Sequence, residues 1–224
     1  MAHVEVEIKS LLGEKANADK LKDKMCSLDP ECACVASNKQ LNHYFEGGDI
    51  YKLYEKTEHL FKGEQHEKFK KITDKGSDFS VRTRQKDEEV LLVVKASIDE
   101  GDSANTVSRL EFEEPACIGL DDLDALVRSA GYQYQAKWSR EREEYVYKNS
   151  NVCIDRNAGY GYLAEFEKVV PDGTDVQEVR KEIESLMAEV GALELPQDRL
   201  ARMFEHYNKN WSDYYGTEKT FVIE

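Results

Sequence analysis

Charged and apolar residues alternate along several strand-length segments, and this alternation constrains the fold of the chain more than any other feature. In residues 3–10 (HVEVEIKS), Val4, Val6 and Ile8 share one face of a strand and the charged residues share the other, because successive strand side chains point to opposite faces. The same alternation recurs in residues 80–85, 91–97, 108–115, 139–145, 151–157 and 162–170. The pattern predicts antiparallel strands, each with one apolar face against a core.

The expected elements follow from this alternation and from helix start and stop signals. Strands are expected at residues 3–10, 37–46, 78–86, 89–98, 105–114, 133–148, 151–157 and 161–170, and helices at 16–28, 119–130, 174–190 and 197–210. A polar stretch at 50–74 is expected to be helical or irregular. Because the strands come in consecutive runs and outnumber the helices, we predict an α+β fold with an antiparallel sheet and helices outside it. No boundary signal divides the chain, so residues 1–224 are interpreted as a single domain.

The composition indicates a globular protein with an acidic surface. At 224 residues, 40% of them hydrophobic, the chain is long enough to bury a sizeable core. Its formal net charge of −14 argues against a general nucleic-acid or acidic-membrane binder, because either partner requires a basic face. There is no run of about 18 apolar residues and no signal peptide. We therefore expect a cytoplasmic protein whose partners include neither nucleic acid nor membrane.

The chain has five cysteines, at positions 26, 32, 34, 117 and 153. An odd and scattered set indicates reduced thiols rather than a disulfide framework. The group formed by Cys26, Cys32 and Cys34 lacks the paired C-x₂-C spacing of a zinc site. We interpret these residues as ordinary thiols.

Pairs of like charges recur on the polar faces of the expected strands. They are Glu5/Glu7, Arg82/Arg84, Glu111/Glu113, Arg140/Arg142 and Glu165/Glu167. One such pair is typical of a solvated sheet face, but neighbouring like charges are unfavourable when they recur strand after strand. Carboxylate pairs suit a hard divalent cation, and arginine pairs suit phosphate. The set as a whole indicates a site for a metal ion and a polyphosphate.

The order of these motifs resembles the CYTH domains, the triphosphate tunnel metalloenzymes. The chain carries an E-x-E-x-K motif at Glu5–Lys9, followed in order by Arg82-x-Arg84, Lys95, Glu111-x-Glu113, Arg140-x-Arg142, Asp155 and Glu165-x-Glu167. The ordered set spans residues 3–170. The chain departs from the family pattern at Arg140, where lysine is frequent, at Asn42, where an acidic residue is common, and in the length of segment 50–74.

The resemblance implies an eight-stranded antiparallel β-barrel that encloses a tunnel, with the charged faces inward and helices packed outside. The barrel would span about residues 3–170 and the C-terminal helices about 174–212. The residues expected to bind triphosphate are Arg82, Arg84, Lys95, Arg109, Arg140 and Arg142. The residues expected to bind Mg²⁺ or Mn²⁺ are Glu5, Glu7, Glu111, Glu113, Asp155, Glu165 and Glu167, and the catalytic group is expected to comprise Glu5, Glu7 and Lys9.

Three functions are compatible with the resemblance. A triphosphatase would use water to cleave tripolyphosphate, thiamine triphosphate or a nucleoside triphosphate. A class IV adenylyl cyclase would convert ATP to cyclic AMP and pyrophosphate, and a binding module would hold a triphosphate without turnover. Because no segment demands a nucleobase pocket, we favour hydrolysis of a small-molecule triphosphate. The aromatic tail at 206–221 is expected to pack on the barrel or on the second subunit of a homodimer, with stacking on a base or a thiamine ring as the alternative.

Overall fold

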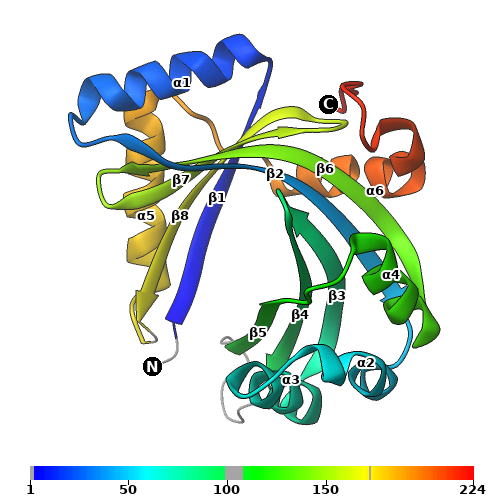
Figure 1. Cartoon of the computed structure of the whole chain (residues 1–224). Helices are drawn as coiled ribbons and strands as arrows, with labels where there is room; N and C mark the ends of the chain where they lie inside the picture. The colour runs from blue at the N-terminus through cyan, green and yellow to red at the C-terminus, as the bar shows by residue number, and fades with distance from the viewer. Residues whose placement is uncertain (1–2, 99–107, 172) are drawn as a thin grey trace. The chain divides into compact units, whose positions relative to one another are not determined.

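The computed structural model describes residues 3–98, 108–171 and 173–224, and it confirms the α+β class (Figure 1). The strands are β1 (His3–Gly13), β2 (Ala33–Gly47), β3 (Ser77–Lys86), β4 (Glu89–Ile98), β5 (Ser108–Pro115), β6 (Tyr132–Tyr147), β7 (Ser150–Asn157) and β8 (Gly161–Pro171). They form one sheet in the order β1-β8-β7-β6-β2-β3-β4-β5. The pairs β1–β8, β8–β7, β7–β6, β2–β3, β3–β4 and β4–β5 are antiparallel. This hydrogen-bonded order is open, with β1 and β5 at its ends, so hydrogen bonds do not close it into a barrel.

The helices of the described residues are α1 (Lys15–Leu28), α2 (Ile50–Thr57), α3 (Glu64–Lys75), α4 (Leu120–Ser129), α5 (Val176–Val190) and α6 (Gln197–Tyr214), with a short 3₁₀ turn at Glu58–Leu60. Helix α5 begins where the sequence predicts it. The Asp175 side chain caps the helix by accepting hydrogen bonds from the backbone amides of Gln177 and Glu178. It ends at Gly191, whose φ of +75° is a left-handed conformation that glycine adopts without strain. No helix in the described part of the chain is both long and apolar enough to cross a membrane.

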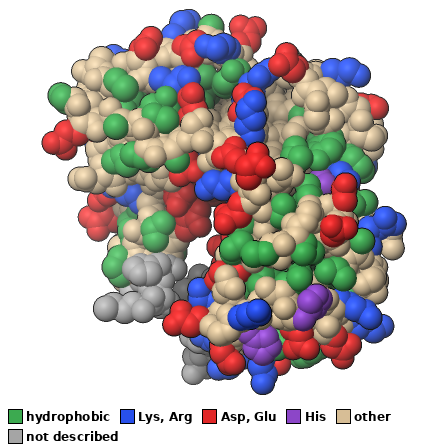
Figure 2. All heavy atoms as spheres, viewed as in Figure 1, with side chains coloured by type: hydrophobic (Ala, Val, Ile, Leu, Met, Phe, Trp, Pro, Cys, Tyr) green, Lys and Arg blue, Asp and Glu red, His purple; other side chains and the backbone are tan. Residues whose placement is uncertain are grey.

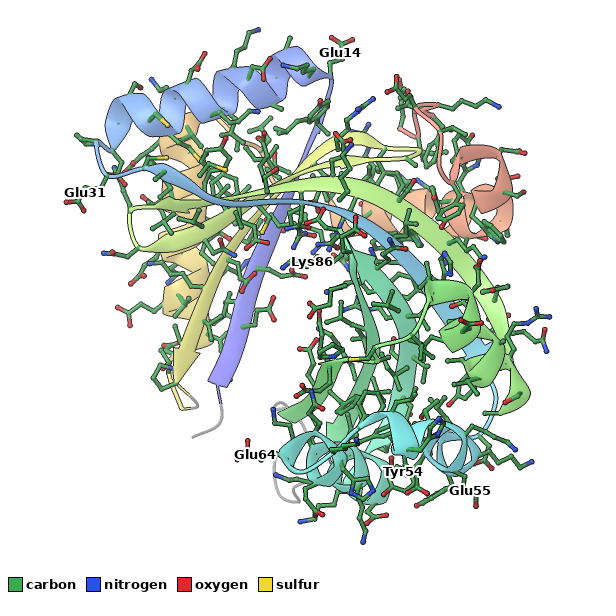
Figure 3. The ribbon with its side chains drawn as sticks, in the orientation of Figure 1. Glu14, Glu31, Tyr54, Glu55, Glu64 and Lys86 are labelled. Carbon is green, nitrogen blue, oxygen red and sulfur yellow. The ribbon has the colours of Figure 1, made fainter. Side chains whose placement is uncertain are left out.

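The predicted boundaries agree with the structure except at a few ends. Strand β2 begins at Ala33 rather than 37, and helix α6 continues to Tyr214 past a break in helical geometry at Asn210. The first residues of the strand expected at 105–114, 105–107, lie outside the described residues. Segment 50–74 is helical, and Figure 3 labels Tyr54 and Glu55 in α2 and Glu64 at the start of α3.

The chain divides into two compact units. Unit 1 consists of residues 1–39 and 139–224, and unit 2 of residues 40–138. Strands β2 and β6 run through both units, so the interpretation of one domain stays a prediction. Acidic and basic side chains are interspersed over the visible surface, as Figure 2 shows.

In unit 1, helices α1 and α5 cover the apolar face of the sheet formed by β1, β8 and β7 (Figure 1). The buried cluster contains Val6 and Ile8 of β1 and Phe166 of β8, which the alternation assigns to one face. Helix α1 contributes Leu21 and Met25 to this cluster. The polar face of the same strands is therefore the face opposite the helices.

The aromatic C-terminal segment packs within unit 1. Tyr207 of α6 is fully buried, and it touches the turn between β7 and β8 at Gly159, where any side chain would collide with its ring. Phe221 lies edge-on to Tyr160 of this turn, with ring centroids 5.4 Å apart. Gly159 also forms a short parallel bridge with Thr220. The homodimer stays a prediction.

In unit 2, segment 50–74 contributes buried side chains to the hydrophobic core. Phe61 and Phe69 pack on Phe112 of β5, and the Phe69 and Phe112 rings stack with centroids 4.6 Å apart. The core also contains a buried polar network around Asp124 of α4. Its carboxylate is bonded to His43, Thr83 and Tyr134 at 2.6, 2.6 and 2.7 Å, which ties α4 to β2, β3 and β6.

Candidate triphosphate and metal site

The polar face of unit 1 brings together the glutamates of β1 and β8. In the antiparallel register Glu7 lies opposite Glu167, and Lys9 lies opposite Glu165. The Lys9 ammonium donates to Glu7 Oε1 at 2.6 Å and is 3.3 Å from Glu165 Oε1. Burial alone would lower the pKa of Lys9, but Glu165 and Glu7 outweigh it and the net shift is upward. Lys9 is therefore a fixed cation that holds two of the predicted site carboxylates in place.

A second ion-pair network joins β6, β7 and β8 on the same face. Arg140 donates to Asp155 at 2.9 Å, and Arg142 donates to both Asp155 oxygens at 2.7 and 2.6 Å. Arg142 also donates to Glu165 Oε2 at 2.6 Å. The side chain of Asp155 is only 1% exposed, so its carboxylate is buried between the two arginines. Asp155 positions the arginine pair, and its predicted role as a metal ligand stays a prediction.

Negative charge is concentrated around Glu167, in the middle of β8. Burial raises the pKa of Glu167, and the nearby carboxylates of Glu5, Glu7 and Glu165 raise it further, to about 7. Glu165, in contrast, has a lowered pKa, because the charges of Lys9 and the two arginines outweigh its burial. The acidic excess on this face is thus concentrated on Glu5, Glu7 and Glu167.

The raised pKa of Glu167 predicts a pH dependence of stability in the metal-free protein. In the unfolded chain the group titrates near 4.5 and in the folded chain near 7, so its contribution is fully present below 4.5 and is lost as the pH rises through 7. We expect Glu167→Gln to be more stable than wild type at pH 8 by on the order of 2 kcal/mol, with little difference at pH 4.5. Urea unfolding in excess chelator at both pH values measures this. Equal differences at the two pH values would contradict it.

The polar face of unit 2 carries the other predicted residues. Arg84 donates to Glu113 at 2.6 Å, and Lys95 lies 3.1 Å from Glu111 across the β4–β5 pair. Arg82 differs, because its Nη1 donates to the phenol oxygen of Tyr44 at 2.8 Å rather than to a carboxylate. Its buried Nε has no hydrogen-bond partner within residues 3–98, 108–171 and 173–224. Arg82 is therefore a cation with an unused buried donor.

Strand β2 adds two residues to this face: Asn42, identified from the sequence only as a departure from the family pattern, and Tyr44, which was not identified from the sequence. Asn42 lies opposite Arg84 and accepts a hydrogen bond from its Nε at 2.8 Å, and Tyr44 lies opposite Arg82 with the guanidinium 5.5 Å from its ring. Both orient an arginine of the predicted phosphate-binding pair. The alternation of Gln40, Asn42 and Tyr44 with apolar or buried neighbours was the signal that could have identified them.

The donor chemistry of unit 1 fits a divalent cation. Within residues 3–98, 108–171 and 173–224, no three His, Cys, Asp or Glu side chains are arranged to hold a metal ion. Mg²⁺ is, however, commonly bound by only one or two carboxylates, with water and phosphate oxygens completing its shell. The opposed pair Glu7 and Glu167 meets that requirement. Of the predicted triphosphate ligands, Arg109 is described only in its backbone, and its side chain lies outside the described part.

A pocket of about 580 Å³ lies in unit 1 on the side that α1 covers, and it shares Arg142 with the ion-pair network of the polar face. Its lining is Lys15, Lys22, Ser37, Glu141, Arg142, Glu143, Ile154, Arg156 and Tyr162. Lys22 is paired with Glu143 at 2.8 Å and Arg156 with Glu141 at 3.5 Å. The cations of this pocket are thus neutralised by neighbouring carboxylates. The acidic excess of the polar face is the better candidate site.

Comparisons with known proteins identify the family and the fold of the chain. The model of the CYTH domain matches residues 3–199. The protein PH1819 of Pyrococcus horikoshii OT3 has a similar structure, with a TM-score of 0.57 at 17% identity, covering 91% of this chain and 99% of that one. A putative adenylate cyclase of Vibrio parahaemolyticus gives 0.54 at 14% identity, covering 92% and 99%.

A third similar structure is the putative adenylyl cyclase HpAC1 of Hippeastrum, described as having a dominant triphosphatase activity. Its TM-score is 0.50 at 16% identity, and the match covers 91% of this chain and 96% of that one. At these identities the likeness shows the fold alone. No curated protein matches the chain. Because the family model extends over nearly all of the sequence, the chain belongs to the CYTH domain family.

Proposed function

We propose that this chain is a divalent-metal-dependent hydrolase of triphosphate compounds. The CYTH family comprises triphosphate tunnel proteins, among them triphosphatases and adenylyl cyclase-like members. The observation that carries the proposal is the distribution of uncompensated charge. Most charged residues of the polar faces are paired with opposite charges across the strands, but the carboxylates around Glu167 are crowded by like charge and Arg82 has an unused donor. These are the properties that a cation and a phosphate would satisfy.

The chain's own residues would act by holding charge in place. Glu7 and Glu167 would hold the cation, and when bound it would polarise phosphate oxygens and lower the pKa of an attacking water. Lys9 fixes the carboxylates of Glu7 and Glu165. Because this cation is locked between two anions, its role is to orient them rather than to move a proton.

The basic residues would bind the phosphates. A guanidinium meets phosphate with two parallel hydrogen bonds, and the protein pre-orients each arginine through a neighbour so that less entropy is lost on binding. Asp155 orients Arg140 and Arg142 in unit 1. Tyr44 and Asn42 orient Arg82 and Arg84 in unit 2.

Hydrolysis is proposed over cyclisation for two reasons. The charged residues described above would bind phosphate and metal. A ligand needs neither a nucleobase nor a ribose to neutralise them. The Hippeastrum protein, a structural neighbour named as a putative adenylyl cyclase, is itself described as having a dominant triphosphatase activity. The cyclase reaction is the alternative, because the Vibrio neighbour is named as a putative adenylate cyclase.

A product assay separates these functions. The purified chain is incubated with Mg²⁺ and, in turn, tripolyphosphate, thiamine triphosphate and ATP, and the products are resolved by chromatography. We expect orthophosphate from tripolyphosphate at a rate at least equal to that from ATP, because the proposed contacts are made to phosphate and metal and not to the nucleobase. Cyclic AMP and pyrophosphate as the main products from ATP would replace the proposal with the cyclase. Binding of all three without turnover would replace it with the binding module.

A further inference from the structure

The connection between α1 and β2 brings two thiols together. Cys26 lies in the last turn of α1 and Cys32 directly before β2, and their sulfur atoms are 3.5 Å apart. Asp29 organises this connection: its backbone amide donates to Met25 O, and its carbonyl accepts from the Cys32 amide at 3.0 Å. The Asp29 side chain accepts from the amides of Glu31 and Lys148 at 2.9 and 2.8 Å. The closeness of the two sulfurs is thus fixed by the backbone of the turn, where Figure 3 labels Glu31.

The environments of the cysteines differ in a way that sets their reactivity. Cys26 is exposed, whereas Cys32 is half-buried against the core of unit 1. Burial and the hydrogen bond with Cys26 raise the pKa of the Cys32 thiol to about 12. Cys34 is exposed and has a different neighbour, since its thiol donates to Ala36 O at 3.4 Å. Of the pair Cys26 and Cys32, Cys26 is therefore the thiol that is accessible to an external reagent, and Cys32 lies directly beside it.

We propose that Cys26 and Cys32 form a reversible thiol-oxidation site, which closes to an intramolecular disulfide by exchange with a low-molecular-weight disulfide such as oxidised glutathione. In the first step the Cys26 thiolate attacks one sulfur of the reagent, which forms a mixed disulfide and releases one thiolate. In the second step Cys32 loses its proton to solvent and attacks the Cys26 sulfur, which releases the second thiolate. The two cysteines lose two electrons, the reagent gains them, and the two thiol protons end on the two released thiols.

The disulfide would fasten one end of α1 to the first residues of β2. Helix α1 buries Ala18, Leu21 and Met25 against the sheet whose other face carries the glutamates of β1 and β8. A covalent link across residues 26–32 limits the freedom of the unfolded chain and retains the helix on the sheet. Oxidation is therefore expected to raise the melting temperature by roughly 5 °C, independently of the activity proposed above.

The test is oxidation of the whole chain with glutathione buffers of increasing oxidised fraction, followed by alkylation and peptide mapping. We expect two fewer reactive thiols than the five of the reduced chain, a cross-link between the peptides of Cys26 and Cys32, and full reversal by excess reduced glutathione. The Cys32→Ser variant should instead hold glutathione on Cys26. The Cys34→Ser variant is the matched control and should oxidise as wild type does.

Three outcomes would overturn the proposal. The first is that all five thiols stay reduced in buffers that oxidise a model dithiol. The second is a cross-link that includes Cys34 instead of Cys32. The third is a stable glutathione adduct on Cys26 of the wild-type chain that Cys32 does not displace. An oxidised protein that melts at the same temperature as the reduced one would refute the stabilisation of α1. The thiol count and the cross-link need no substrate, so they do not depend on the proposed hydrolase.

Discussion

Replacing Glu167 by glutamine is expected to lower the turnover of tripolyphosphate by about 100-fold or more, because it removes a ligand charge where the cation is proposed to bind. Glutamine keeps the size of the side chain, and Glu167 is crowded by Glu5, Glu7 and Glu165, so the metal-free fold should survive the change. Steady-state kinetics at saturating Mg²⁺ and circular dichroism of the same sample measure both effects.

The matched control is Glu143→Gln. Glu143 is also a partly exposed strand glutamate of unit 1 in an ion pair, but its partner is Lys22 of α1, on the helix-covered side. We expect its turnover to stay within about 3-fold of wild type, as for a surface ion pair of little consequence. Equal losses in the two variants would show that charge removal in this sheet acts through stability, and unchanged turnover in Glu167→Gln would remove Glu167 from the metal site.

Replacing Asp155 by alanine is expected to lower the free energy of unfolding by about 3–5 kcal/mol, the usual cost of removing one partner of a buried ion pair. The Asp155 carboxylate is 1% exposed and accepts three hydrogen bonds from Arg140 and Arg142, which would be left without their buried anion. Urea denaturation at neutral pH without metal or substrate measures the loss.

The control for this variant is Arg156→Ala on the same strand. Arg156 is paired with Glu141 and Glu218, but these ion pairs are exposed, and their loss should cost less than about 1 kcal/mol. A loss of that size for Asp155→Ala would contradict the buried ion-pair network. It would leave Asp155 free for the metal role that the sequence analysis assigned to it.

The strand faces could be predicted because they depend only on local alternation. A period of two assigns Glu5, Glu7 and Lys9 to one face and Val6 and Ile8 to the other, whatever the partner strand is. The core of unit 1 confirms that assignment, because it contains Val6 and Ile8. Segment 50–74 was harder to predict, because its helices are stabilised by tertiary packing rather than by propensity: α2 packs on α4 and α3, and α3 packs on β5.

The partners of the charged residues could not be predicted, because register between strands distant in sequence decides them. Like-sign pairs within a strand suggested that a ligand must neutralise each of them. In the structure the neighbouring strands neutralise most: Asp155 and Glu165 face Arg142, Glu113 faces Arg84, and Glu111 faces Lys95. Among the described side chains, the charge that remains for a ligand is smaller than the sequence indicated. It is the carboxylate group at Glu167 in unit 1 and the unused donor of Arg82 in unit 2.

The proposed metal dependence is tested by measuring the release of orthophosphate from tripolyphosphate before and after metal removal. We expect excess EDTA to abolish release and Mg²⁺ or Mn²⁺ added beyond the chelator to restore it, because the carboxylates around Glu167 are proposed to hold the cation. Full activity in excess EDTA would contradict the account.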